Sequence, residues 1–265
     1  MRPNDPAYSR YARHYDKIGQ RRFGESSATD LLRILELQGE RPQSVLDLAC
    51  GTGAATIVFA RSGLETTGLD IAHAMIEEAS AAAKSAGVSI RWVLADMTAY
   101  EADRQYDLCT CFYDAVNYLT DLREFSAFAR CAYDALNPGG TFAFDINTRR
   151  KLAEHWGQMT LIAANDSDRF LTYRSWFDER HGVSPLIITG FERREDGAWD
   201  RFDEEHVETA FAIDDLRSKL ESAGYEQIQV IDWREGDISD LAPGTEAAFR
   251  VLFMARKPAT AQEES

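Results

Sequence analysis

The chain has 265 residues, of which 45% are hydrophobic, and carries 44 acidic against 29 basic side chains, for a net charge of −15. This length fits one domain, or one domain with an insertion, and the hydrophobic content is ordinary for a globular core. Nucleic-acid binding requires Lys and Arg to neutralise phosphates, so the acidic balance disfavours RNA and DNA as partners. No run approaches the ~20 apolar residues of a membrane span, so we expect no membrane contact.

The cysteines and the first residues bear on the cellular compartment. The chain has four cysteines without a C-x-x-C pair, and its polar first residues contain no apolar run. Both features favour a reduced, cytoplasmic protein without a secretory signal. The sequence leaves open whether the protein is a monomer or a homodimer.

The first elements are expected to be helical. Tyr8, Tyr11 and Tyr15 have the spacing of one helix face, and a second apolar pattern predicts a helix over 25–37. The tyrosine stripe favours packing in the core, with a lid over a bound ligand as the alternative.

Strand and helix patterns then alternate. The predicted strands are 45–49, 65–69, 89–94, 106–112 and 141–146, and the predicted helices are 54–61, 72–86 and 122–136. A turn is expected at 137–140, where the sequence is Asn-Pro-Gly-Gly. Such alternation is typical of a parallel sheet with helices on both faces.

The pattern changes after Arg149. Aromatic, alternating segments predict strands at 169–177, 186–192 and 199–211, and Asp196-Gly197 is a hairpin signal. Helix returns at 213–223, followed by strands at 225–233 and 247–255. We therefore predict an α/β fold with a Rossmann-like, mostly parallel seven-stranded sheet and a small antiparallel β insertion. Its parts are a core of 1–148 and 212–258, an insertion of 149–211 and a disordered tail of 259–265.

The stretch SVLDLACGTG, from Ser44 to Gly53, is typical of a buried strand that ends in a glycine turn before a helix. Asp70 ends the next apolar run. A strand, a Gly-x-Gly turn, a helix and an acid at the tip of the next strand form a nucleotide-binding crevice, where the acid can accept from ribose hydroxyls.

Two positions argue against a dinucleotide in that crevice. Thr56 occupies the place where the dinucleotide fingerprint requires a small residue. Asp47 lies just before the turn, where it would repel a pyrophosphate but suit a cation. A nicotinamide-dependent oxidoreductase is therefore the weaker interpretation.

The D-x-A-C-G-T-G string closely resembles motif I of the class I S-adenosylmethionine-dependent methyltransferases, and the resemblance extends over most of the chain. It implies S-adenosyl-L-methionine as cofactor, with Gly51 and Gly53 at its methionine part, Asp70 at its ribose, and Asp96 and Met97 at its adenine. The predicted cofactor-binding residues are Asp47, Ala49, Gly51, Gly53, Asp70, Ile71, Met75, Asp96, Met97, Phe112, Tyr11 and Tyr15.

In this family the segment after the fourth strand usually meets the substrate, and here it reads FYDAVNY over 112–118. It contains neither the Asn/Asp-Pro-Pro-Tyr/Phe string of base and amide methylation nor a Pro-Cys pair. Together with the insertion, it resembles the small-molecule branch that methylates amino sugars and glycine-like amines. The resemblance implies methyl transfer to a nitrogen of a small metabolite. An O-methyltransferase and a cofactor-binding protein without turnover are the alternatives.

The methyl donor is already activated, so positioning can supply most of the catalysis. An amine acceptor must still lose a proton, which Asp114 or a neutral His206 could accept, with Tyr113 facing the acceptor. Alternatively, Asp114 could cap the following helical turn, and His206 could pair with Glu204, which shares its strand face.

No metal is expected. Asp203 and Glu205 point to the opposite strand face from His206, so the three cannot converge. Asp145 and Asn147 share a face and are similar to residues of metal-dependent O-methyltransferases, which is a weaker interpretation. The other four histidines are expected at the surface: His14, His73, His155 and His181.

Overall fold

The computed structural model describes residues 6–234, 238 and 241–259. The predicted tail, 259–265, lies outside the described residues except for its first position. The main sheet has seven strands in the order β10-β11-β5-β4-β1-β2-β3, and β11 runs antiparallel to both of its neighbours while the others are parallel. Its strands are β1 (Ser44–Leu48), β2 (Glu65–Asp70), β3 (Arg91–Leu94), β4 (Tyr106–Cys111), β5 (Leu136–Asn147), β10 (Glu226–Asp232) and β11 (Arg250–Arg256).

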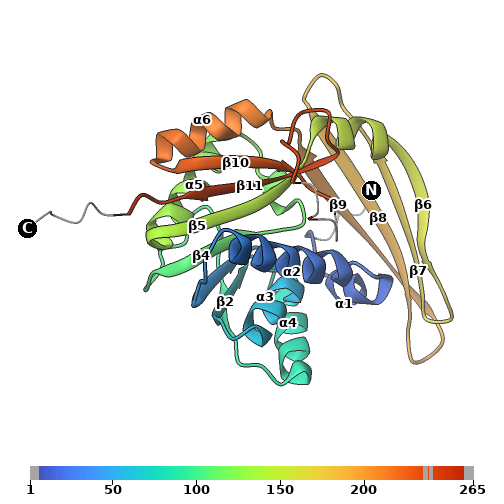
Figure 1. The fold of residues 1–265 in the computed structure, drawn as a ribbon. Helices are drawn as coiled ribbons and strands as arrows, with labels where there is room; N and C mark the ends of the chain where they lie inside the picture. The colour runs from blue at the N-terminus through green and yellow to red at the C-terminus, as the bar shows by residue number, and fades with distance from the viewer. Residues whose placement is uncertain (1–5, 235–237, 239–240, 260–265) are drawn as a thin grey trace, which may run out of the picture.

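Helices cover both faces of this sheet (Figure 1). They are α2 (Arg21–Leu37), α3 (Ala54–Arg61), α4 (His73–Ala86), α5 (Leu122–Ala135) and α6 (Ile213–Ala223). Side chains alternate between the faces along each strand: Val45 packs with α2 and α3, whereas Leu46 and Leu48 pack with α5 and α6. The predicted α/β class with a mostly parallel sheet is thereby confirmed.

The expected turn at 137–140 is instead part of β5, and the prediction was wrong. Pairing between β4 and β5 shifts register after Tyr106, so these residues form an irregular stretch within one strand. Gly139 and Gly140 exchange backbone hydrogen bonds with Lys257, which extends the strand past the glycines. Tertiary pairing thus overrides the local turn signal.

A second sheet has four antiparallel strands in the order β6-β7-β8-β9. They are β6 (Gln158–Asn165), β7 (Arg169–Trp176), β8 (Val183–Arg193) and β9 (Trp199–Thr209). The hairpin at Asp196-Gly197 is confirmed, with Gly197 at a φ of +84°. β6 was not predicted, because this edge strand is mostly exposed and shows no apolar alternation.

The N-terminal segment, which precedes α2, packs against the second sheet and connects it to the helices of the main sheet. Among the described residues of this segment, only α1 (Ala12–Tyr15) is α-helical. The expected helix with Tyr8, Tyr11 and Tyr15 on one face therefore does not form. Backbone N–H groups of Tyr8, Arg10 and Tyr11 donate to the carboxylate of Glu204 on β9, at 2.7, 2.7 and 2.9 Å. A 3-10 turn, η1 (Asp16–Ile18), then leads toward α2.

His14 corrects another expectation. Its side chain is buried rather than exposed, stacks on Phe202 and hydrogen-bonds Glu192 of β8. The contact adds to the attachment of the N-terminal segment to the second sheet.

Candidate functional site

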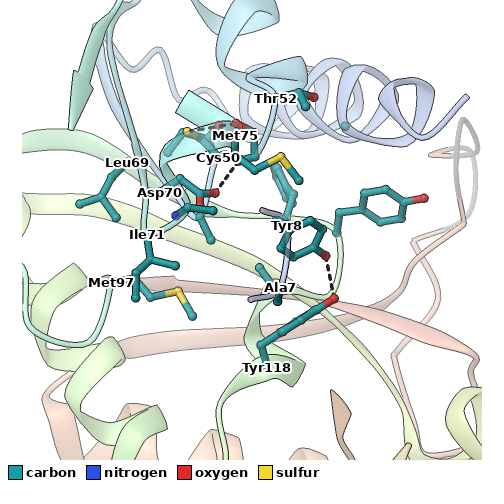
Figure 2. A pocket seen from close by; sticks show the side chains of 18 of the residues that line it. Ala7, Tyr8, Cys50, Thr52, Leu69, Asp70, Ile71, Met75, Met97 and Tyr118 are labelled. Atoms are coloured by element: carbon teal, nitrogen blue, oxygen red, sulfur yellow. Dashed lines mark hydrogen bonds between the residues drawn. The ribbon is translucent and has the colours of Figure 1, made fainter. Parts of the chain in front are cut away.

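A cavity of about 410 Å³ opens at the carboxyl ends of β1, β2, β3 and β4 (Figure 2). This is the edge of an open α/β sheet where ligands bind. The N-terminal segment contributes Ala7, Tyr8 and Tyr15 to its wall. Ten of the predicted cofactor-binding residues line it: Asp47, Ala49, Gly51, Asp70, Ile71, Met75, Asp96, Met97, Phe112 and Tyr15.

The two glycines of the Gly-x-Gly turn have different surroundings. Gly51 has a φ of +55°, and a Cβ atom there would meet no atom within 4 Å, so its open side leaves room for a ligand. A Cβ atom at Gly53 would come within 2.8 Å of Trp92 and 3.1 Å of Ala79. Gly53 is not among the described residues that line the cavity. Its lack of a side chain instead permits close packing against β3 and α4.

Asp47 is a buried carboxylate at the base of the cavity. It accepts hydrogen bonds from the hydroxyls of Thr56, at 2.6 Å, and Thr110, at 2.7 Å. Burial raises the pKa of Asp47 to about 6, against the lowering effect of these two bonds. A positively charged ligand would therefore stabilise the ionised form of this side chain.

The carboxylate of Asp70 hydrogen-bonds the backbone of two turns in the cavity wall. Its Oδ2 accepts from the backbone N–H of Gly51 and its Oδ1 from that of Ala72, both at 2.8 Å. Burial also raises the pKa of Asp70, despite these bonds. The carboxylate is thus held in place while it still lines the cavity.

Apolar side chains line the cavity around Asp70 (Figure 2). Met75, Met97 and Ile71 border it, and Ile71 leaves 70% of its surface exposed. Asp96 turns the chain there by accepting from the backbone N–H and the hydroxyl of Thr98, both at 2.8 Å. An aromatic ring would fit between these thioether and aliphatic side chains.

Tyrosines form the other end of the cavity. Four of them line it: Tyr8, Tyr15, Tyr113 and Tyr118. The hydroxyls of Tyr8 and Tyr118 lie 2.6 Å apart, as Figure 2 shows with a dashed line. Burial raises the pKa of Tyr8, Tyr15 and Tyr118 well above the ordinary value, so these side chains are neutral phenols.

His206 lies behind this tyrosine cluster. The Tyr118 hydroxyl is 3.0 Å from His206 Nδ1, and His206 Nε2 is 3.2 Å from a carboxylate oxygen of Glu204. The expected pairing of His206 with Glu204 is present. His206 is not among the described residues that line the cavity. Tyr118, which lines the cavity, is therefore hydrogen-bonded to His206, which does not.

Strained backbone is concentrated at the cavity. Tyr8, Ala49 and Tyr113 all line it and have φ values of +60°, +51° and +63°. Left-handed conformations are uncommon for residues other than glycine and cost of order 1–3 kcal/mol each. Such strain persists where the surrounding structure fixes the chain for a function.

Asp114 does not face the cavity. Its carboxylate lies 2.8 Å from Arg250, which also pairs with Asp145, and Asp145 accepts the Tyr113 N–H at 2.6 Å. Asp114 precedes the short 3-10 helix η2 (Ala115–Tyr118) but makes no side-chain capping bond. The carboxylate pairs with Arg250 and makes no capping bond, and its proton-accepting role stays a prediction.

Sequence reasoning missed Arg250 and Gln20. Arg250 lies 136 residues from Asp114 in the chain, and no local pattern marks it. Gln20 lines the cavity and accepts from the Tyr113 hydroxyl. Tyr11, in turn, lies outside the described lining, because its hydroxyl bonds Tyr173 of β7 in a small core shared by the two segments.

Among the described residues, no group of three or more His, Cys, Asp or Glu side chains is arranged to hold a metal ion. None of the helices in the same part of the chain is both long and apolar enough to cross a membrane.

Comparisons with known proteins agree with this geometry. A family model of the methyltransferase domain matches residues 45–140. The malonyl-[acyl-carrier protein] O-methyltransferase of Pseudescherichia vulneris is 30% identical over 191 residues, which cover 69% of this chain and 71% of that protein. The chain belongs to the class I S-adenosylmethionine-dependent methyltransferases. The enzyme's cofactor is therefore S-adenosyl-L-methionine.

Solved structures share the fold of this methyltransferase over almost its whole length. An S-adenosylmethionine-dependent methyltransferase from Clostridium acetobutylicum ATCC 824 has a TM-score of 0.79 at 24% identity, covering 95% of this chain and 99% of that one. A sugar N-methyltransferase from Streptoalloteichus sp. ATCC 53650 has a TM-score of 0.70 at 19% identity, covering 95% and 93%. Both matches cover 95% of this chain, which leaves out too few residues to omit the second sheet. That sheet is therefore part of the shared fold.

Proposed function

We propose that this methyltransferase transfers the methyl group to the nitrogen of a small, amine-bearing metabolite. The observation that carries the proposal is the charge of the cavity. Four carboxylates line it, with four tyrosines and, among the described residues, no Lys, Arg or His. The carboxylates are Asp47, Asp70, Asp96 and Glu124. Such a lining favours a cofactor and an acceptor that both carry positive charge.

The cofactor would occupy the acidic and apolar parts of the cavity. The open side of Gly51 leaves space for its methionine portion, and Asp70 would accept from its ribose hydroxyls. Met75 and Met97 would pack on its adenine. When bound, S-adenosyl-L-methionine supplies a methyl group already activated by a sulfonium, which leaves positioning of the acceptor to the protein.

The tyrosine end would hold the acceptor. Aromatic faces attract ammonium groups, and Tyr8, Tyr15 and Tyr118 line this end of the cavity as neutral phenols. An ammonium acceptor must lose a proton before its lone pair can attack. Tyr118 can pass this proton to His206, whose charge Glu204 stabilises from the far side.

Transfer to oxygen is the second candidate, and the O-methyltransferase relative favours it. An anionic oxygen acceptor would meet the carboxylates of the cavity without a balancing cation among the described lining residues. A neutral hydroxyl acceptor is compatible with the same proton route through Tyr118. The charge of the lining therefore favours nitrogen over a carboxylate oxygen, and less strongly over a hydroxyl.

A screen of acceptors tests the proposal. The full-length enzyme is incubated with S-adenosylmethionine and with primary amines, alcohols or carboxylic acids of matched size, and S-adenosylhomocysteine release is measured. The proposal predicts release with amines and none above background with carboxylic acids. Turnover of carboxylic acids alone would contradict it. Binding of the cofactor without turnover of any class would instead favour a binding protein.

The cytoplasmic setting remains a prediction. All four cysteines are free thiols in the structure, which is compatible with a reducing compartment.

A further inference from the structure

A second cavity, of about 720 Å³, lies on the other side of Tyr113. It is bordered by the start of α2, by the short π-helical turn η3 (Lys151–His155) after β5, and by residues at the ends of β10 and β11. Tyr113 and its neighbours Gln20 and Phe23 separate it from the first cavity, and Tyr113 lines both. Tyr113 is therefore the residue that the two cavities share.

The charge of this cavity is opposite to that of the first. Its described lining holds five cationic residues against one carboxylate, Asp232, in a chain whose net charge is −15. The cationic residues are Arg22, Arg150, Lys151, Arg234 and Arg250. Positive charge concentrated in a concave surface attracts anions.

Lys151 differs from Arg150 and Arg250, which both form ion pairs. Arg250 pairs with Asp114 and Asp145, and Arg150 lies 3.0 Å from Glu154. No carboxylate among the described residues lies within ion-pair distance of the Lys151 ammonium. Burial, and then the charge of Arg250, lower the pKa of Lys151, whereas the carboxylates of Asp114, Glu208 and Asp145 raise it. An anion in the cavity would add to the negative charge that acts on this ammonium.

Hydrogen-bond donors are also in excess there. The indole N–H groups of Trp156 and Trp233 are shielded from solvent and have no acceptor in the described part of the chain. Buried donors without a partner are rare in folded proteins and call for an explanation. With the cationic side chains, they give this cavity a surplus of donors over acceptors.

We propose that the second cavity binds an anionic group, a carboxylate or a phosphate, of the acceptor whose amine is methylated in the first cavity. This inference rests on the proposed function. The acceptor would then carry both charges: its ammonium lies among the tyrosines, and its anionic group lies at Lys151, on the other side of Tyr113. Lys151 is the side chain whose charge the anion would match.

Direct binding of simple anions tests the site without any methyl transfer. Inorganic phosphate and succinate are titrated into the full-length protein while tryptophan fluorescence is recorded, because Trp156 and Trp233 border the cavity. We expect saturable binding of at least one anion, weakened by about tenfold or more in Lys151→Met. Lys84→Met removes the same charge from an exposed position on α4 and should bind as the unmodified protein does.

Two controls keep the result interpretable. Binding of S-adenosylhomocysteine should be unchanged in Lys151→Met, which shows that the variant is folded, and Lys151→Arg should recover most of the anion affinity. Equal anion binding by Lys151→Met and the unmodified protein would overturn the inference, as would no saturable binding of either anion. An absence of N-methylation with intact anion binding would instead overturn the proposed function.

A series of acceptors links the anion site to turnover. Primary amines of the same chain length that end in a methyl, a carboxylate or a phosphate group are compared as substrates. We expect the anionic members to have the lower KM, and Lys151→Met to remove that preference with little change in kcat. A KM that does not depend on the terminal group would contradict the inference, and the better of the two anionic groups identifies the source of the charge.

Discussion

The hydroxyl of Thr56 on α3 donates a 2.6 Å hydrogen bond to the carboxylate of Asp47 on β1. These are the two residues that depart from a dinucleotide-binding fingerprint, and the structure shows that they form one unit. A small residue at position 56 would deprive the buried carboxylate of a partner. The cavity is thereby built around a negative charge, which suits a cationic cofactor and opposes a pyrophosphate.

The first prediction concerns ligand selectivity. S-adenosylmethionine and S-adenosylhomocysteine should raise the melting temperature, and NAD should not, because Asp47 and Asp70 disfavour a pyrophosphate. A ligand that binds only the folded state stabilises it by ~2.7 kcal/mol at a concentration a hundred times Kd. Differential scanning fluorimetry provides the measurement. A shift with NAD alone would contradict the account of the cavity.

The second prediction concerns pH. The pKa of Asp47 is raised to about 6, so this carboxyl is ionised above that pH and protonated below it. A cationic ligand favours the ionised form, and its binding must release the proton at lower pH. Affinity for S-adenosylmethionine should therefore fall as the pH drops below about 6, by at most tenfold per pH unit.

Calorimetric titrations between pH 5 and 8 would measure this dependence. Asp47→Asn should bind more weakly at neutral pH and lose most of the dependence. An affinity that stays constant through this range in the unmodified protein would mean that Asp47 does not sense the ligand's charge.

The third prediction compares two carboxylates. Asp70→Ala should weaken cofactor binding more than Asp96→Ala does. Asp70 is buried, fixes both Gly51 and Ala72, and would accept two charge-assisted hydrogen bonds of ~1.5–3 kcal/mol each. Asp96 is exposed, and its carboxylate hydrogen-bonds only Thr98 among the described residues.

Titration calorimetry measures both losses, and Asp70→Asn serves as the matched control because it keeps an acceptor for one of the two turns. Equal losses in the two alanine variants, or a larger loss in Asp96→Ala, would contradict the assignment.

The fourth prediction concerns the route of the proton. Tyr118→Phe and His206→Ala should each reduce turnover of an amine while leaving cofactor affinity unchanged, because the two side chains follow one another away from the tyrosine end of the cavity. Removing either one interrupts the same path, so the double variant should lose little more than the single variants. The pH profile of kcat/KM separates this role from a structural one.

If Tyr118 and His206 only support the fold, the variants would lower kcat at every pH without moving the profile. Additive losses in the double variant would likewise remove His206 from the proton route.

Local patterns were sufficient to predict most of the fold, and the resemblance to the methyltransferase family supplied the residues expected at the cofactor end of the cavity. Each strand and α-helix from β1 to α5 was predicted from apolar periodicity and glycine turns, whereas the start of β5 was not. Gly51, Asp70 and Met97 line the cavity because each lies at or just after the end of a strand, and the carboxyl ends of parallel strands meet at one edge. Position along such a strand therefore fixes position in the site.

The acceptor end could not be predicted in this way, because it depends on contacts between distant segments. Glu204 captures the backbone at Tyr8, and Arg250 captures Asp114, over separations of 196 and 136 residues. In the folded chain Asp114 pairs with Arg250 and is not among the described residues that line the cavity. His206 does not line it either, and it hydrogen-bonds Tyr118, which does. Neither pairing leaves a periodic signal in the sequence, since a single charged residue on a strand or a loop does not indicate its partner.

The identity of the atom that receives the methyl group tests the central claim most directly. The enzyme is incubated with S-adenosylmethionine labelled with ¹³C in its methyl group and with an acceptor that carries both an amine and a hydroxyl. The product is then examined by carbon–proton correlation NMR, which separates N-methyl from O-methyl signals. The account predicts that the label appears as an N-methyl group that survives treatment with base. A label found only on oxygen would contradict it.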